Sequence, residues 1–331
     1  MIKNWKNILL AAILVLAVDA CAKLPDDNTS ISYDRMLKSW IKVNHPEAVY
    51  NKDAGVYVLN EVQGSGRSVM DSSYIFVHFT STDLDGNILN TNDEYLDKMI
   101  GGYDRTNYYG SLIWRLGQGY IYDGLEEYVK KMKVGSYSRL AIPVEAAVIS
   151  NAVYAAMAAS GKDNLLFEFT MDDAVDDIHA YELSKLKEYD DANYKIGSML
   201  MDGQYFKILE SASETDTIAD KAKINVRYVG RRLDGTVFDT NIEDSAKFHR
   251  IYDSSEDYDA LSITFSKDSA TFAEDNTVVD GFGNAIMQMK YGEKSVTYFS
   301  SDLGYAEKGS GSAIPSYCPL SFWIYIEPKD K

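Results

Sequence analysis

The clearest pattern in the sequence is a strand, a tight turn and a second strand. Ile224, Val226 and Tyr228 fall on one face and polar residues alternate with them, a period of two that is typical of a half-buried strand. The Leu-Asp-Gly sequence at 233–235 is a turn signal, and a return strand begins over 236–238. The pattern therefore predicts a β-hairpin.

A short helix and two further strands are predicted after this hairpin. The helix begins near Asp280 and ends at 290–292, where Lys-Tyr-Gly places a basic residue and a glycine as a C-terminal stop. Residues 295–299 and the apolar run LSFWIYI at 320–326 predict the closing strands. One short helix against a bent antiparallel sheet is an α+β fold.

The same landmarks occur twice along the chain, in the same order and at nearly the same spacing. The matched segments are 55–61 with 203–210, Asp85-Gly86 with Asp234-Gly235, and 120–143 with 278–300. Such self-similarity indicates an internal duplication. Residues 172–199, between the copies, are highly charged and predict a helical linker whose acidic run is a solvated face.

The first 20 residues predict a secretory signal peptide. Lys3 and Lys6 precede an apolar run from Ile8 to Val18, which gives a basic head and a short apolar core. The run is shorter than the roughly 20 residues of a membrane-spanning helix. Residues 1–20 are therefore expected to be a targeting segment outside the fold.

Cys21 follows Val18-Asp19-Ala20, and this stretch resembles a bacterial lipobox. The resemblance implies cleavage before Cys21 and lipidation of that residue, with residues 21–50 as a lipidated tether. Several acyl chains together anchor a protein stably. Asp19 departs from the pattern, and the alternative is a plain signal peptide with an incidental cysteine. The expected location is the outer membrane of the bacterial cell envelope. The sequence does not decide between its periplasmic side and its surface side.

Length and charge narrow the classes of function. The 331 residues suffice for two domains with separate cores, and the formal net charge of −17 disfavours nucleic-acid binding. The four histidines show no metal-ligand spacing, and no nucleotide-binding or nucleophile motif stands in a fitting context. We therefore expect no metal and no cofactor. The oligomeric state is left open.

Four segments of the second copy stand together as a motif set: VRYVGRRLDGTVFDT (226–240), VVDGFGNAIMQMKYGEK (278–294), LGYAEKGSGSAIP (303–315) and LSFWIYI. In this order they resemble the FKBP family of peptidyl-prolyl cis-trans isomerases. The resemblance implies a bent antiparallel β-sheet wrapped around a short α-helix, with an aromatic pocket for a prolyl ring, in an isomerase domain over 200–331. The first copy, over 51–171, resembles the family more faintly and is predicted to be a degenerate FKBP-like domain.

The resemblance also assigns roles to single positions. Asp239, Tyr305 and Val279 are the implied catalytic residues: the Val279 main-chain N–H and the Tyr305 hydroxyl hold peptide carbonyls, and Asp239 orients neighbouring groups. The implied substrate-binding residues are Tyr228, Phe238, Val278, Phe282, Ile314 and Phe322. Taken singly, these large apolar residues read as core, so the joint order carries the interpretation. Phe282 stands where the family has tryptophan, which makes the pocket floor smaller.

These residue types suit the rotation of an X-Pro bond. The barrier of about 18–20 kcal/mol comes from amide resonance, and the twisted transition state is less polar than the planar amide. A dry aromatic pocket favours that state without a nucleophile, metal or proton donor. The predicted function is therefore prolyl isomerisation in proline-containing polypeptides of the envelope or the secreted fraction. The alternative is a non-catalytic FKBP-like binding or chaperone lipoprotein, because fold alone does not decide.

The first copy departs further from the motif set. Its matching residues are Phe79, Leu89-Asn90 and Leu125, and residues 144–164 replace the Gly-rich tyrosine loop with a stretch that reads as helical. We expect the fold to survive there without the aromatic pocket, leaving a catalytically silent spacer, dimeriser or client-binding surface. In the second copy an acidic insert at 241–277 adjoins the pocket rim, and its role is left open.

Overall fold

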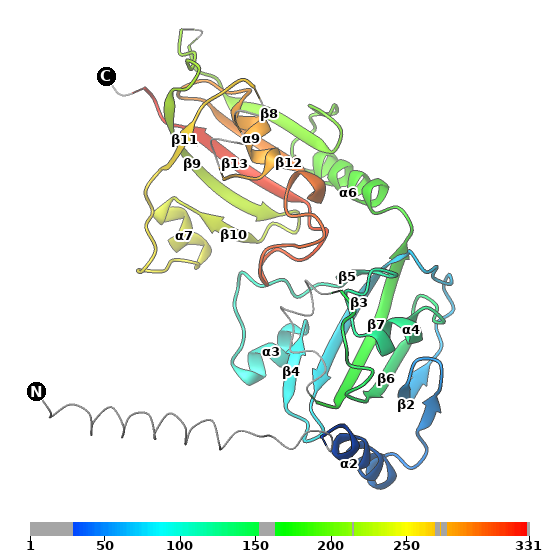
Figure 1. Ribbon diagram of the computed structural model, residues 1–331. Coiled ribbons are helices and arrows are strands. Elements are labelled where there is room, and N and C mark those ends of the chain that lie inside the picture. The colour runs from blue at the N-terminus through cyan, green and yellow to red at the C-terminus, as the bar shows by residue number, and fades with distance from the viewer. Residues whose placement is uncertain (1–28, 152–162, 214, 269–271, 273–276, 330–331) are drawn as a thin grey trace, which may run out of the picture.

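The computed structural model describes residues 29–151, 163–213, 215–268, 272 and 277–329. Two antiparallel sheets, each with a short helix against it, are joined through helix α6 (Ile178–Asn193) (Figure 1). The predicted signal peptide and Cys21 lie outside the described residues. Within the described ranges, the structure contains no helix of the length and apolar character needed to cross a membrane.

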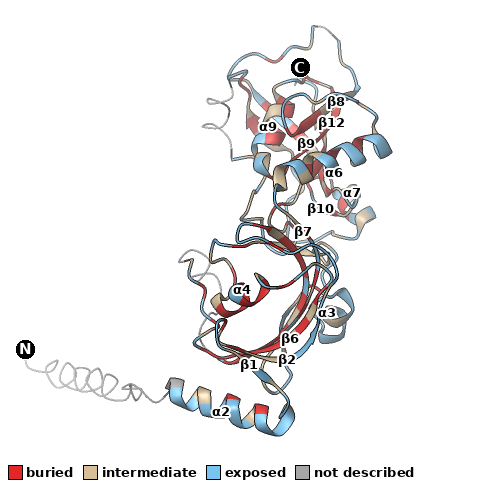
Figure 2. Ribbon diagram, turned by 90° about the vertical axis from the view of Figure 1, so that its right-hand side faces the viewer, coloured by how far each residue is buried: buried red, intermediate tan, exposed pale blue. Residues whose placement is uncertain are grey.

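The first sheet curves around helix α4, as Figure 2 shows for strands β2, β6 and β7. The strand order among its described residues is β1-β2-β6-β7-β3-β4, with β5 paired to β3. Its elements in chain order are β1 (Val49–Asn51), β2 (Val56–Val62), β3 (Tyr74–Thr82), β4 (Ile88–Thr91), α3 (Glu94–Ile100), β5 (Leu112–Arg115), α4 (Asp123–Val129), β6 (Tyr137–Ile142) and β7 (Leu165–Val175). We call this part the first unit.

The second sheet repeats the plan. The strand order among its described residues is β10-β9-β13-β12-β8, with β11 paired to β9. Its elements in chain order are β8 (Gln204–Glu210), β9 (Lys223–Arg232), β10 (Val237–Thr240), α7 (Glu243–His249), β11 (Leu261–Thr264), α9 (Asp280–Ile286), β12 (Lys294–Phe299), the 3₁₀ turn η1 (Ser301–Leu303) and β13 (Leu320–Ile326). We call this part the second unit.

The two units share one order of connections. Strands β2-β6-β7-β3-β4 correspond in order to β8-β12-β13-β9-β10, and α4 and α9 occupy the same place in each succession. This is the arrangement that an internal duplication produces. The sheets are antiparallel, α4 and α9 each pack on one face, and α2 and α6 pack on the opposite faces, so the predicted α+β class is confirmed.

Part of the predicted tether is a helix. α2 (Thr29–Asn44) buries Leu37 and Ile41 against Leu59, Ala141 and Leu166 of the first unit. The two helical residues are four apart, so they lie on one face of the helix. Residues 29–44 of the predicted tether segment at 21–50 are therefore helical and packed on the first unit, because this face has an apolar surface on which to pack.

Helix α9 is shorter than predicted, ending at Ile286 rather than at 290–292. The chain leaves it through a tighter turn, in which the Met289 N–H donates to the Ile286 carbonyl at 3.0 Å. The Glu293 carboxylate then accepts the Lys290 N–H at 2.8 Å. Gly281 lets α9 approach the sheet, since a Cβ there would lie 2.3 Å from the Phe299 ring.

The stretch after β6 is not helical where it is described. Residues 145–151 form turns and bends, and residues 152–162 lie outside the described ranges. The Val148 and Ala146 carbonyls accept the N–H groups of Asp123 and Gly124 at 2.8 and 3.1 Å. These carbonyls therefore satisfy the free donors at the start of α4, which is why this part of the chain does not continue a helix of its own.

Helix α6 lies within the predicted linker and packs on the second unit through Leu186, which contacts Tyr205 and Tyr298. The sequence predicted that the acidic residues of this linker face solvent. Two of them, Glu182 and Asp190, are instead buried. Asp190 accepts the Tyr298 hydroxyl at 2.5 Å. Glu182 accepts the N–H and the hydroxyl of Ser301 at 2.6 and 2.7 Å.

Glu182 gives the chain a testable pH dependence. Burial raises the pKa of its carboxyl from 4.5 to about 7, and nearby Asp302 adds to this, while the Ser301 hydrogen bonds and His179 oppose it. The folded state thus favours the protonated form, so the stability from Glu182 is fully present below pH 4.5 and is lost as pH rises through about 7. Between pH 4.5 and about 7, the free energy of unfolding of the parent is expected to fall by roughly 2–3 kcal/mol more than that of Glu182→Gln. Urea unfolding at a series of pH values measures this, and equal slopes for the two chains would contradict it.

Candidate functional site

An open hollow of about 360 Å³ lies in the second unit beside the start of α9. A volume of this size is within the range of small-ligand pockets. The residues that line it are Tyr228, Phe238, Asp239, Leu261, Ser262, Ile263, Thr277, Val278, Val279, Phe282, Tyr305 and Phe322. Eight of the nine residues predicted for the site are in this set, drawn from β9, β10, α9 and β13, the residues before α9 and the loop after β12.

Aromatic rings form the walls and floor of the hollow. Phe282 is 3% exposed, with its ring centroid 5.2 Å from that of Phe322 and 5.8 Å from that of Tyr228, both in edge-on contact. The Phe238 ring meets Phe322 edge-on at 5.8 Å. Edge-to-face packing at these distances is favourable, so the rings hold one another in place and leave an apolar space between them.

Two hydroxyls and one carboxylate lie at the rim. The Tyr228 hydroxyl donates to Asp239 Oδ2 at 2.7 Å. Burial raises the pKa of Tyr228, and the Asp239 carboxylate raises it further. Burial and then Asp239 raise the pKa of the half-exposed Tyr305 as well. Both tyrosines therefore stay protonated at neutral pH and can donate a hydrogen bond.

Val279 adds a main-chain donor. It is the N-cap residue of α9, with extended backbone at φ −68° and ψ 149°, and its carbonyl accepts the N–H groups of Phe282 and Gly283. Among the described residues, none accepts a hydrogen bond from the Val279 N–H itself. The hollow therefore combines an apolar interior with peptide-type donors at its edge.

Ile314 does not line the hollow. Its side chain is 4% exposed and belongs to the core of the second unit. Its main chain forms a tight bridge, with the Ser310 N–H donating to the Ile314 carbonyl at 2.7 Å. The structure therefore places Ile314 in the core beside the hollow and not in its lining.

The prediction missed four lining residues. Leu261, Ser262 and Ile263 belong to β11, which pairs with β9, and Thr277 precedes the Val278-Val279 pair. All four lie in the acidic insert at 241–277, so part of that insert frames the hollow. The alternation of Leu261, Ser262 and Ile263 was a strand signal, but their place beside the hollow follows only from the pairing with β9.

Gly230 offers a direct test of the ring arrangement. A Cβ at this position would lie 2.8 Å from Phe238 Cζ and 2.9 Å from Phe322 Cε1. Gly230→Ala must therefore displace rings that line the hollow. We expect it to weaken the binding of a prolyl peptide about tenfold or more, the equivalent of about 1.4 kcal/mol. Calorimetric titration measures this, and unchanged affinity in a folded variant would contradict the position given to these rings.

The second unit thus has the architecture of a small α+β domain with a ring-walled hollow. Residues 214–327 match the model of the FKBP-type peptidyl-prolyl cis-trans isomerase family. This part of the chain is an FKBP-type peptidyl-prolyl cis-trans isomerase domain.

Curated relatives agree with this assignment. The chain is 28% identical over 127 residues to a macrophage infectivity potentiator of Trypanosoma cruzi, covering 38% of this chain and 53% of that relative. It is 28% identical over 124 residues to a probable FKBP-type peptidyl-prolyl cis-trans isomerase of Haemophilus influenzae, covering 38% and 42%. The chain thus spans about half the length of the curated relatives that it matches.

Two solved structures are also similar. One is a peptidyl-prolyl cis-trans isomerase of Pseudomonas syringae pv. tomato, at 24% identity and a TM-score of 0.32, covering 45% of this chain and 91% of that one. The other contains the three FKBP domains of wheat FKBP73, at 16% identity and a TM-score of 0.29, covering 84% and 95%.

The first unit has a hollow at the corresponding place, contrary to the expectation that its aromatic pocket is lost. This hollow measures about 570 Å³, and its lining includes Phe79, Leu89, Asn90, Trp114, Tyr120, Ile121, Tyr122, Leu125 and Phe167. Trp114 of β5 and Tyr122, just before α4, supply rings that the comparison of the two copies did not match. The pair corresponding to Phe238-Asp239 is Leu89-Asn90, so an amide stands at the place of Asp239, and the carboxylate in the lining is that of Asp163.

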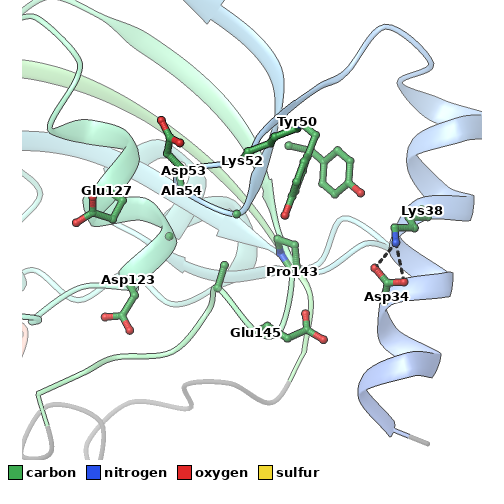
Figure 3. Close-up of a pocket in the computed structure, with 14 residues that line it drawn as sticks. Asp34, Lys38, Tyr50, Lys52, Asp53, Ala54, Asp123, Glu127, Pro143 and Glu145 are labelled. Carbon is green, nitrogen blue, oxygen red and sulfur yellow. Dashed lines mark hydrogen bonds and ion pairs between the residues drawn. The ribbon is translucent and has the colours of Figure 1, made fainter.

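A further hollow of about 740 Å³ lies between α2, the β1–β2 turn and the start of α4 (Figure 3). Half of its lining residues are charged, and Lys38 pairs with Asp34 at 2.9 Å (Figure 3). It has no ring-walled floor like that of the second unit. Among the described residues, no group of three or more His, Cys, Asp or Glu is placed to hold a metal ion.

Proposed function

We propose that the protein is a peptidyl-prolyl cis-trans isomerase that acts through its second unit. The observation that carries this is the ring-walled hollow with Asp239, Tyr305 and the Val279 N–H at its rim. A prolyl ring would enter the apolar space between Tyr228, Phe282 and Phe322. The Val279 N–H and the Tyr305 hydroxyl would hold the flanking peptide carbonyls, which fixes the peptide while its imide bond turns.

Rotation in this site needs no bond to the enzyme. The planar X-Pro amide is polar and well hydrated, while the twisted transition state has lost its resonance. An apolar hollow therefore disfavours the ground state more than the transition state, and this difference lowers the barrier. The Tyr228–Asp239 hydrogen bond keeps the carboxylate at the rim and out of the apolar space.

The test is a refolding assay in which isomerisation of an X-Pro bond limits the rate. The full chain is expected to accelerate the slow phase in proportion to its concentration, and Tyr305→Phe is expected to reduce this effect. If neither folded chain changes the rate of the slow phase, the proposed isomerase activity is wrong. The alternative of a non-catalytic FKBP-like binding or chaperone protein would then hold.

The hollow of the first unit supports a second proposed role, which is the binding of polypeptides without isomerisation. Its hollow keeps aromatic walls but has Phe79 in place of Tyr228 and Asn90 in place of Asp239. It therefore has apolar space for a client segment, and Phe79 and Asn90 cannot form a counterpart of the Tyr228–Asp239 hydrogen bond. Titration of Trp114 fluorescence with a proline-containing peptide tests this role, and Trp114→Leu should remove the signal and weaken binding.

The N-terminal segment supports a proposed cellular location. The basic head, the apolar run and Cys21 of the lipobox-like stretch favour export and a lipid anchor at the bacterial cell envelope. Clients would then be proline-containing envelope or secreted polypeptides, whose X-Pro bonds isomerise slowly enough to limit folding. Mass spectrometry of the purified chain tests the anchor, since Cys21→Ala should abolish acylation.

A further inference from the structure

The loop of residues 300–319 carries Tyr305 to the hollow. The Tyr305 carbonyl accepts the N–H groups of Lys308 and Gly309 at 3.2 and 3.1 Å. Further along, the Tyr317 N–H donates to the Ala306 carbonyl at 2.8 Å. These bonds tie the carbonyls of Tyr305 and Ala306 to the rest of the loop, so a displacement of the loop displaces Tyr305.

The guanidinium of Arg232 holds this loop to the first unit. Arg232 ends β9 and is 4% exposed. Its Nη1 donates to the carbonyls of Ala313 and Thr106, each at 2.6 Å, and its Nη2 donates to the Asn107 carbonyl at 3.3 Å. One buried cation thus bonds the main chain of the loop and the main chain of the first unit.

Residues 106–108 of the first unit also bond the loop directly. The Tyr108 N–H donates to the Ser312 carbonyl at 2.9 Å, and the Ser312 hydroxyl donates to Asn107 Oδ1 at 2.5 Å. The Arg232 guanidinium lies over the Tyr108 ring, 5.4 Å from its centroid, a distance at which a cation is attracted to a ring face. We call these contacts of Arg232 and residues 106–108 with residues 312–313 the interdomain clamp.

Both ends of the loop are held from outside the second unit as well. At the start, Glu182 of α6 accepts the N–H and hydroxyl of Ser301. At the end, the Tyr317 ring meets Tyr74 of β3 edge-on, with centroids 5.1 Å apart. The loop is therefore held at three places. Glu182 of α6 holds its start, the interdomain clamp holds its middle, and Tyr74 of the first unit contacts its end.

We propose that the first unit positions Tyr305 for prolyl isomerisation by holding the loop of residues 300–319 through the interdomain clamp. Arg232 is then a positioning residue, since it lines neither the rim nor the floor of the hollow. This inference rests on the proposed function. It assigns the first unit a part in the activity of the second, because Thr106, Asn107 and Tyr108 belong to the first unit.

The physical argument is the conformational freedom of an unheld loop. Gly309 and Gly311 adopt positive φ values of 62° and 60°, which glycine reaches at little cost, so the loop has other conformations available. A catalytic hydroxyl must be kept close to its productive position, and small displacements cost rate steeply. The clamp supplies that constraint by hydrogen bonds to main-chain carbonyls of the loop.

The test uses the full chain with Arg232→Met, which removes the guanidinium and keeps an apolar stem. The matched control is Arg231→Met, the preceding residue on β9, whose side chain points to the opposite face of the sheet. Arg232→Lys restores a charge and part of the donor set. Tyr108→Ala perturbs the clamp from the first unit and serves if Arg232→Met does not fold.

Four quantities are measured on each chain: kcat and KM for isomerisation of a prolyl peptide, the affinity for that peptide, and amide hydrogen exchange across residues 300–319. Arg232→Met is expected to lower kcat about tenfold with a smaller change in KM. Exchange at the Lys308 and Gly309 amides is expected to rise about tenfold, while exchange in β12 and β13 stays as in the parent. Arg232→Lys should recover part of both effects, and Arg231→Met should show neither.

The outcomes separate this inference from the proposed function. Faster loop exchange with unchanged kcat would overturn it, because Tyr305 would not depend on the clamp. Lower kcat with unchanged loop exchange would overturn it too, because Arg232 would act by another route. A parent chain without isomerase activity would refute the proposed function. The clamp is then judged on loop exchange and peptide affinity, and a change in neither would overturn it.

Discussion

Replacing Phe282 with alanine is expected to lower the free energy of unfolding by about 3–5 kcal/mol. The side chain is 3% exposed and its ring packs against Tyr228 and Phe322. Its loss leaves a cavity lined by rings that can close only partly. Because the same ring is the floor of the hollow, the folded variant should also lose most of its isomerase activity. Chemical denaturation measures the first effect, and peptide isomerisation under strongly native conditions measures the second.

Leu125→Ala is the matched control, because Leu125 occupies the corresponding place on α4 and is 1% exposed. It should also destabilise the chain, by about 2–5 kcal/mol. The folded variant should keep the activity of the parent, since Leu125 lies in the core of the first unit and makes none of the contacts of the interdomain clamp. Loss of activity in Leu125→Ala under native conditions, or full activity in Phe282→Ala, would contradict a site confined to the second unit.

Asp239→Ala is expected to lower kcat/KM about tenfold or more, because a charge-assisted hydrogen bond contributes about 1.5–3 kcal/mol. Its carboxylate accepts the Tyr228 hydroxyl at 2.7 Å and faces Tyr305. Without it, the Tyr228 hydroxyl loses its acceptor and the two tyrosines lose the charge that orders them. Stability should change little, since Asp239 is exposed. The measurement is kcat/KM for a set of X-Pro peptides.

Asp244→Ala is the control for the loss of one negative charge. Asp244 is exposed in the first turn of α7 and does not line the hollow. It should retain the kcat/KM of the parent. Equal losses in both variants would show that net charge, and not the hydrogen bond to Tyr228, sets the rate.

The sequence was most informative where local patterns coincide with the fold. The alternation at Ile224, Val226 and Tyr228 predicted β9, and the apolar run at 320–326 predicted β13. Eight of nine predicted site residues line one hollow because the motif order preserves which strands and loops converge on α9. Ile314 was the exception, since its side chain lies in the core beside the hollow, and no residue pattern encodes that placement.

Features that depend on contacts between distant segments were not predicted. The ring-walled hollow of the first unit arises because Trp114 and Tyr122 come together with Phe167 of β7, three rings from separate segments of the chain. Arg232 is the second of two adjacent arginines in the sequence. Only the structure shows that one is buried between the units and the other is not.

The most direct test of the account is exchange spectroscopy by NMR on an Ala-Pro peptide mixed with the full chain. The account predicts exchange peaks between the cis and trans prolyl signals that grow with protein concentration. It also predicts nuclear Overhauser contacts from the prolyl ring to the aromatic protons of Phe282 and Phe322. A peptide that contacts these rings without cis–trans exchange, or that contacts neither ring, would contradict an isomerase site in this hollow.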